Sequence, residues 1–305
     1  MDDFSLQQPR GHKKLIKWLI RNLPLIIIAI CLLVYYTMFA PFANKDATIH
    51  ISSGQSMKSI REELKDKNVI RSEIILQTFV KVLKSGKGVV SGDYLIKKNT
   101  PVWKVAWQIG RGHHNLESVK ITIREGLSND EIAAIFADKL AGFRKDLFLS
   151  KVNGQQGYLF PDTYFFFPLD TADEIVDKLS SNFDNKIKTV SSDISKSGKS
   201  LNDIIVMASI LEGEANGKED IYIISGILWK RISLGMPLQV DVDKATYTNK
   251  GLPDKPLNNP GLTAIKAAAL PTSSSYLYYL HDEDGIVHFA KSFEEHKLNI
   301  KKYLK

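Results

Sequence analysis

The feature that most constrains this chain is a run of eighteen residues without a charge, from Leu23 to Ala40. As a helix, a run of that length spans about 27 Å, close to the roughly 30 Å of a bilayer's hydrocarbon core. Five basic side chains and two acidic ones precede it within residues 1–22. Because basic residues stay on the cytoplasmic side, we predict a cytoplasmic tail over 1–22 and a transmembrane helix over 23–40.

Two other interpretations of the apolar run remain. A cleaved signal peptide has an apolar core of about 7 to 15 residues, which is shorter than this one. Pro41 makes both Ala40 and Ala43 poor cleavage sites. A buried core helix is the second alternative, but such a helix rarely carries a basic flank on one side only. We therefore expect a single-pass membrane protein whose remaining residues lie outside the cytoplasm.

Composition excludes several classes of function. The chain has 305 residues, 44% hydrophobic and 25% charged, which is ordinary for globular domains. Its net charge is +7, but +3 of this lies in the first 22 residues and we find no dense basic stripe, so nucleic acid is not an expected partner. A single cysteine, Cys31, excludes a disulfide framework and a Cys-based zinc site. No HExxH, P-loop or GxSxG motif is present, and we predict neither metal nor cofactor.

Residues 47–112 are predicted to form a small αβ module with the order strand, helix, helix, strand, helix. Ser56 is placed to cap the first helix, and Pro101 to open the last one. The segments SGQSMKSI and GDYLI resemble a LysM-like module, a small fold associated with glycans that contain N-acetylglucosamine. A generic two-layer domain would account for the same pattern.

Residues 113–200 are interpreted as an intermediate segment. It begins with a strand-like SVKITI and continues with a helix for which Ser128 and Glu131 form a capping box. The conspicuous phrase GYLFPDTYFFF follows at 157–167. The Ser/Lys-rich stretch SSDISKSGKS at 191–200 is predicted to be a linker that ends this segment.

Two carboxylates at the end of the next predicted helix point to chemistry. The helix begins at Leu201 and Asn216-Gly217 should stop it, which places Glu212 and Glu214 in its last turn, on opposite edges of the apolar stripe. Acidic groups there oppose the helix dipole. Half-buried carboxylates in such a field have raised pKa values and can hold a proton near neutrality. The alternative is a pair of solvated residues at a fraying helix end.

Five stretches, in order, resemble the endolytic murein transglycosylase (YceG-like) family. They are GYLFPDTYFF, MASILEGEA (207–215), ISGILWKRISLGMPLQVD, NNPGLTAIKAAALPTSSSYLYYL and HFAKSFEEHKLNIKKYL. The resemblance covers nearly all of the chain after the basic tail. It implies an α+β fold with a catalytic core over 201–305.

The resemblance also implies an activity. Members of this family cut the β-1,4 bond between N-acetylmuramic acid and N-acetylglucosamine in peptidoglycan strands and leave a 1,6-anhydro end. Glu214 matches the catalytic glutamate and Glu212 takes a supporting role. Gln239, Asp241 and Asn259 are the expected substrate-binding residues. Expected partners are peptidoglycan strands, the membrane and peptidoglycan synthases.

The chain departs from the family pattern at three places. Gly213 stands between the two glutamates where Lys or Arg is usual, Lys297 follows His296 where Asn is usual, and the segment 246–258 is shortened. Two alternatives therefore stay open. One is a non-catalytic peptidoglycan-binding scaffold for synthases, and the other is a water-using muramidase with a second carboxylate, for which Asp243 is a candidate.

Overall fold

The computed structural model describes residues 11–36, 40, 42–43, 45–83, 88–214 and 220–304. The chain divides into two compact units, Met1–Glu117 and Ser118–Lys305, which are called here the N-terminal and C-terminal units. Both contain helices and short antiparallel strand pairs, so the predicted α+β class is confirmed.

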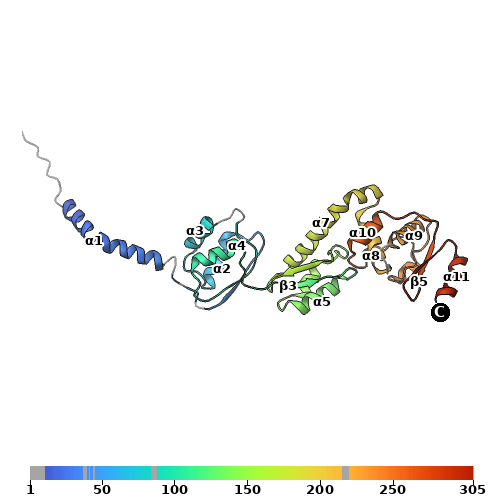
Figure 1. The fold of residues 1–305 in the computed structure, drawn as a ribbon, viewed down its shortest axis with the longest axis horizontal. Helices are drawn as coiled ribbons and strands as arrows, with labels where there is room; N and C mark the ends of the chain where they lie inside the picture. The colour runs from blue at the N-terminus through green and yellow to red at the C-terminus, as the bar shows by residue number, and fades with distance from the viewer. Residues whose placement is uncertain are drawn as a thin grey trace, which may run out of the picture. The chain divides into compact units, whose positions relative to one another are not determined.

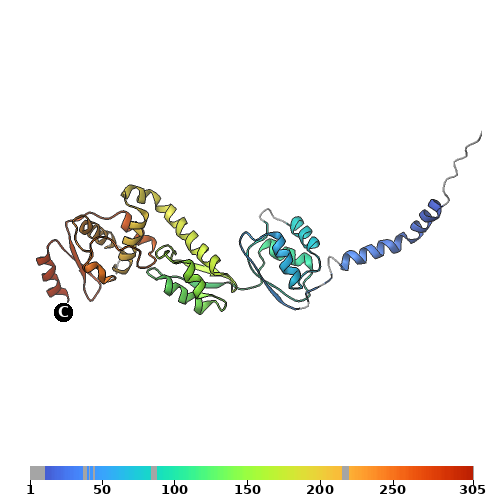
Figure 2. The same cartoon turned by 180° about the vertical axis from the view of Figure 1, so that it is seen from behind.

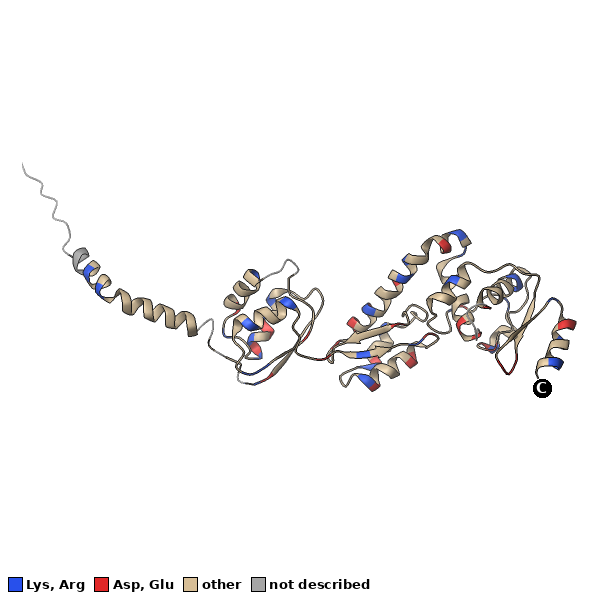
Figure 3. Ribbon diagram, in the orientation of Figure 1, with Lys and Arg blue, Asp and Glu red and all other residues tan. Residues whose placement is uncertain are grey.

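The apolar run lies in a longer helix than predicted, α1 (Gly11–Val34). Its membrane-length apolar part is Leu15–Val34, with none of it buried inside the protein. Lys and Arg lie near the start of the helix and the rest carries no charge (Figure 3). Pro24 lies inside this helix. The last part of the predicted span, residues 37–39, lies outside the described residues.

The predicted order of the small module is confirmed. Its elements are β1 (Ala47–Ile51), α2 (Met57–Asp66), α3 (Glu73–Leu83), β2 (Gly92–Ile96) and α4 (Val102–Arg111). The two strands pair antiparallel with Ile49 opposite Tyr94, and both side chains are fully buried against the helices. Ser56 caps α2 by accepting a hydrogen bond from the Ser59 backbone N–H, because the first turn of a helix leaves such donors unpaired.

The first part of the C-terminal unit is built on a pair of antiparallel strands. Its elements are β3 (Val119–Thr122), α5 (Asn129–Lys139), α6 (Lys145–Lys151), β4 (Thr163–Phe166) and α7 (Ala172–Ser197). In both views α5 runs along one side of the β3–β4 strand pair and α7 along the other (Figures 1 and 2). Phe136, Phe148 and Phe166 fill the space between them. The capping box of Ser128 and Glu131 is present as predicted.

The prediction of a linker at 191–200 was wrong, because α7 continues to Ser197 and ends at Gly198 in the left-handed conformation. Val190 is buried and Ile194 packs against the same apolar cluster as the next helix. The Ser and Lys residues that suggested a linker alternate with this buried stripe. Residues on both sides of the expected boundary therefore share one core.

The remaining elements surround one buried helix, α8 (Leu201–Glu214). They are α9 (Ile221–Ser233), the 3₁₀ helix η2 (Lys244–Tyr247), α10 (Leu262–Ala269), β5 (Tyr278–His281), β6 (Val287–Ala290) and α11 (Phe293–Tyr303). All side chains of α8 from Ile204 to Leu211 are buried. Glu212 and Glu214 therefore sit where this helix leaves the core. The predicted stop at Asn216-Gly217 lies outside the described residues.

Candidate active site

The carboxylate of Glu214 is held by donors from two distant segments. Oε1 accepts hydrogen bonds from the backbone N–H groups of Asp241, at 2.7 Å, and Val242, at 3.2 Å. Oε2 accepts from the phenol hydroxyl of Tyr279, at 3.1 Å. Charge-assisted bonds of this kind fix an acidic group in one orientation.

Glu214 opens onto a cavity of about 520 Å³. Its polar wall is formed by Glu214, Arg231, Gln239 and Asp241, while Tyr278 and Phe293 supply aromatic surface. The contributing elements α8, α9, β5 and α11 gather at the C-terminal end of the chain (Figure 1). A cavity of this size with a few convergent polar groups is typical of a ligand-binding site.

The loop that presents the two backbone donors is fixed by one buried threonine. The Thr246 hydroxyl donates to the Asp243 carbonyl at 2.6 Å and accepts from the Val240 N–H at 3.0 Å. The Thr246 carbonyl also accepts a hydrogen bond from the Gln239 N–H. Gln239 has a positive φ of 54°. Such a backbone angle is costly outside glycine and persists where the surroundings enforce it. The turn 239–246, which ends where the shortened segment begins, is therefore well defined beside Glu214.

The unusual Gly213 has a structural reason. A Cβ atom at this position would overlap Cγ1 of Val242. The absence of a side chain at Gly213 leaves room for the Val242 side chain, and the backbone N–H groups of Asp241 and Val242 reach Glu214 at the end of α8. The departure from the family pattern at position 213 thus serves the same contact that orients the carboxylate.

Arg231 orients the predicted substrate-binding residue Gln239. The Arg231 side chain is buried, with Nε donating to the Pro237 carbonyl and Nη2 to Oε1 of Gln239. Within the part of the chain that the structure describes, no carboxylate pairs with this guanidinium. Because arginine can only donate, the amide oxygen of Gln239 must face it, which leaves the amide nitrogen as a donor toward the exposed side.

Asp241, also predicted to bind substrate, stands exposed at the rim of the cavity. One of its oxygens accepts from Lys244 at 2.6 Å and from the Tyr247 hydroxyl at 2.9 Å. These two hydrogen bonds, Lys244 first, hold the pKa of Asp241 below its usual range. It is therefore a second, ionised carboxylate in the cavity wall.

Glu212 points to a different set of neighbours, as the helical spacing predicted. Its Oε2 accepts from the Gly261 N–H at 2.8 Å, at the start of α10. Burial raises the pKa of Glu212, and the nearby charge of Glu125 raises it further, while the Gly261 hydrogen bond lowers it. The raised pKa expected for a carboxylate at this helix end is thus found at Glu212. The residue joins α8 to α10 and stands outside the cavity lining.

The structure does not support a substrate-binding role for Asn259. Its side chain is fully buried, and Oδ1 accepts from the N–H groups of Gly157 and Leu159 at 3.0 and 2.9 Å. Nδ2 donates to the Leu127 carbonyl and to Asn129. With both ends of the amide occupied, Asn259 has no capacity left for a sugar. It is a structural residue that joins three segments of the C-terminal unit.

Asp243, considered above as a second carboxylate, caps η2 by accepting from the Ala245 N–H at 3.0 Å. Several cavity residues were not singled out from the sequence, among them Arg231, Tyr247 and Tyr279. Arg231 and Tyr279 lie inside the stretches LWKRIS and YLYYL that carried the family resemblance. Their position there was the available signal, but it gave no indication of which side chains face the carboxylate.

Comparison with known proteins gives consistent matches. The YceG-like family profile matches residues 49–243 and 245–302. The endolytic murein transglycosylase of Bacillus subtilis strain 168 is 28% identical over 84% of both chains. The protein of that name from Streptococcus pneumoniae D39 is 22% identical over 86% of this chain, which spans 59% of the streptococcal protein. The crystal structure of a yceG-like protein from Listeria monocytogenes matches with a TM-score of 0.55 and 25% identity, over 84% of this chain and 99% of that one.

Proposed function

The chain belongs to the YceG-like family, and on this premise we propose that it is an endolytic murein transglycosylase, with Glu214 as its catalytic residue. Murein is peptidoglycan. The reaction cuts the β-1,4 bond between N-acetylmuramic acid and N-acetylglucosamine within a strand and leaves a 1,6-anhydro muramoyl end.

One carboxyl group suffices for this reaction. Protonated Glu214 donates its proton to the glycosidic oxygen as the bond from that oxygen to the muramoyl C1 breaks. The muramoyl 6-hydroxyl then closes onto C1 and returns its proton to Glu214. No water is consumed. Ordinary glycosidases need a second carboxylate, as nucleophile or as base for water, whereas here the substrate supplies its own nucleophile.

The observation that carries the proposal is the fixed carboxylate in the cavity wall. Among the described residues, three donors hold Glu214, and the aromatic rings of Tyr278 and Phe293 line the same space. Gln239 offers an amide donor and Asp241 a carboxylate for sugar hydroxyl or N-acetyl groups. These are the components that cleavage of a polysaccharide strand requires: a general acid, polar donors and apolar surface.

We propose that α1 anchors the protein in the bacterial inner membrane. Its apolar stretch Leu15–Val34 is long enough to cross, and Lys17 and Arg21 near its start favour a cytoplasmic N-terminus. The catalytic unit then lies on the side where peptidoglycan is assembled. Peptidoglycan synthases, which produce the strands, are the expected partners.

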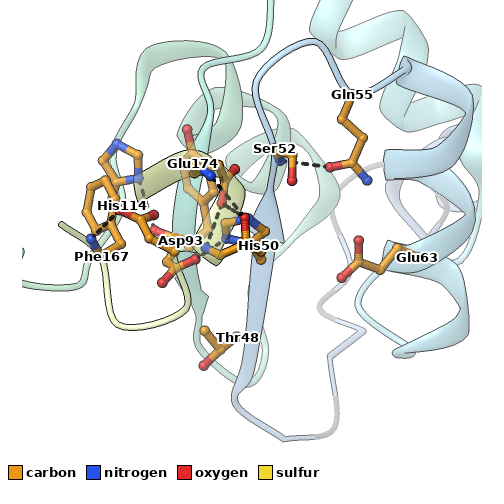
Figure 4. A network of polar contacts seen from close by, with 12 residues as sticks. Thr48, His50, Ser52, Gln55, Glu63, Asp93, His114, Phe167 and Glu174 are labelled. Carbon is orange, nitrogen blue, oxygen red and sulfur yellow. Dashed lines mark hydrogen bonds and ion pairs between the residues drawn. The ribbon is translucent and has the colours of Figure 1, made fainter. Parts of the chain in front are cut away.

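The N-terminal unit supports a LysM-like interpretation. A cavity of about 510 Å³ is lined by the loop that follows β1 and by the segment that precedes β2. In this loop the Ser52 N–H donates to Oε1 of Gln55 at 3.0 Å (Figure 4). His50 and Asp93, on the two paired strands, are joined at 2.6 Å beside it (Figure 4). We propose that this cavity contacts glycan, which is also what a non-catalytic scaffold would do.

The test is product analysis with the full-length protein in detergent and purified glycan strands. We expect soluble fragments with anhydro ends, and a loss of at least 10²-fold in rate for Glu214→Gln at unchanged melting temperature. Glu283→Gln, on the exposed turn between β5 and β6, is the control and should cleave at the wild-type rate. Strand retention without fragments would indicate the scaffold. Ends about 18 Da heavier would indicate the water-using muramidase, with Asp241 as its second carboxylate.

A further inference from the structure

The hydrogen bonds around Glu214 distinguish its two oxygens. Oε1 faces the backbone N–H groups of Asp241 and Val242, which can donate but cannot accept. A proton placed on Oε1 would point at these two hydrogens. In the protonated acid, Oε1 is therefore the carbonyl oxygen.

Oε2 has a different kind of partner. Among the described residues it is bonded by the hydroxyl of Tyr279, which can donate to a charged oxygen and can also accept from a protonated one. Burial, and next the charge of Glu214, raise the pKa of the Tyr279 phenol well above its usual range. Tyr279 therefore keeps its own proton at any pH at which the protein works.

The ring of Tyr279 is held in place by its surroundings. It lies on β5, opposite Phe289 of β6, and packs against the apolar cluster around α8. The His281 ring meets it edge to face, with ring centroids 6.0 Å apart. The hydroxyl thus reaches Glu214 from a rigid support.

We propose that Oε2 of Glu214 is the oxygen that exchanges the proton with the substrate, and that Tyr279 is the positioning residue that holds this oxygen toward the cavity. The inference rests on the proposed function. In the first half of the reaction the Oε2–H bond breaks and the proton passes to the glycosidic oxygen as the C1–O bond breaks. The Tyr279 hydroxyl then donates to the negative Oε2.

In the second half, the 6-hydroxyl oxygen forms its bond to C1 and its proton passes to Oε2. The acid is restored, and the Tyr279 hydroxyl turns to accept from it. Tyr279 neither gains nor loses a proton over the cycle. Its contribution is the geometry of Oε2 and the stability of the intermediate anion.

The test variant is Tyr279→Phe, which keeps the buried ring and removes the donor. We expect kcat to fall about 10- to 100-fold, as for loss of a hydrogen bond to a charged group, with KM within twofold of the wild type. Because the anion loses a donor, the alkaline limb of the pH–rate profile should move to higher pH. Tyr276→Phe is the matched control, since Tyr276 stacks on Phe289 outside the cavity and should leave both quantities unchanged.

A second substitution keeps the test independent of folding. Replacing Tyr279 by 3-fluorotyrosine makes the phenol a stronger donor at nearly the same size, and the alkaline limb should move to lower pH. An unchanged kcat and pH profile in Tyr279→Phe, or an equal loss at all pH values with a raised KM, would overturn the inference. Both results leave the proposed function intact. The proposed function fails if the wild-type protein releases no anhydro-ended fragments.

Discussion

Cγ1 of Val242 occupies the position that a Cβ atom at Gly213 would need. This contact places the turn after Gln239 against the end of α8. The Val242 N–H of the same turn donates a hydrogen bond to Glu214. A glycine inside the last turn of a helix weakens that helix. Here it leaves room for the Val242 side chain beside Glu214, the proposed catalytic residue.

Gly213→Ala tests this relationship. Alanine favours the helix by about 1 kcal/mol, but its methyl group collides with Val242. We expect the 241–242 turn to move away from Glu214 and kcat to fall by about tenfold or more, while the melting temperature stays within a few degrees. The double variant Gly213→Ala with Val242→Gly removes the collision and should recover much of the lost rate. Full activity in the single variant would contradict the relationship.

Glu212→Gln tests the supporting carboxylate through its pH dependence. Burial raises the folded-state pKa of Glu212. The contribution of this group to the stability of the wild type is therefore fully present at low pH. It is lost as the pH rises from the ordinary glutamate range, about 4.3, through the raised value. Glutamine keeps an oxygen for the Gly261 N–H and does not ionise. Denaturant unfolding should show the variant gaining stability relative to the wild type above that range. A constant difference between pH 4 and 8 would contradict the assignment.

Asn259→Ala separates a structural role from a sugar-binding one. Truncation leaves the buried N–H groups of Gly157 and Leu159 without their acceptor. Each such loss costs about 1 to 3 kcal/mol, so unfolding free energy should drop by about 3 kcal/mol or more. Asn259→Asp keeps the acceptor and loses the donation to Leu127. Its unfolding free energy should lie between those of the wild type and Asn259→Ala. A stable alanine variant with a raised KM would restore the substrate-binding prediction.

Gln239→Glu tests the orientation of the cavity amide. Glutamate keeps an oxygen for Arg231, so the guanidinium stays paired, but the exposed N–H₂ donor is lost. We expect kcat/KM on glycan strands to fall about 10- to 100-fold with no loss in melting temperature. Gln239→Ala should lose melting temperature as well, since it leaves Arg231 without that acceptor. Equal activity of Gln239→Glu and the wild type would remove this amide from the binding site.

The features that the sequence predicted well are those set by near neighbours in the chain. Ser56 and the Ser128–Glu131 box cap their helices through residues three positions away. The divergence of Glu212 and Glu214 also followed from helical spacing alone. Each of these depends on short-range geometry that a local pattern contains.

The errors arose where distant segments decide the outcome. The Ser/Lys composition of 191–200 suggested a linker, yet Val190 and Ile194 belong to the core that α8 completes. Asn259 looked available as a polar residue in a family stretch, but its partners lie 100 to 130 positions away. The three donors to Glu214 come from residues 27 to 65 positions further along. No local pattern could indicate them.

Two of the three donors to Glu214 are main-chain amides, and this limits what mutational scanning can detect. An alanine scan across 241 and 242 leaves both amide hydrogens in place, so it reports on the two side chains and not on these hydrogen bonds. Related sequences can likewise vary there while keeping the contact. Only proline removes an amide hydrogen, so a proline scan of this turn would expose a dependence that side-chain truncation conceals.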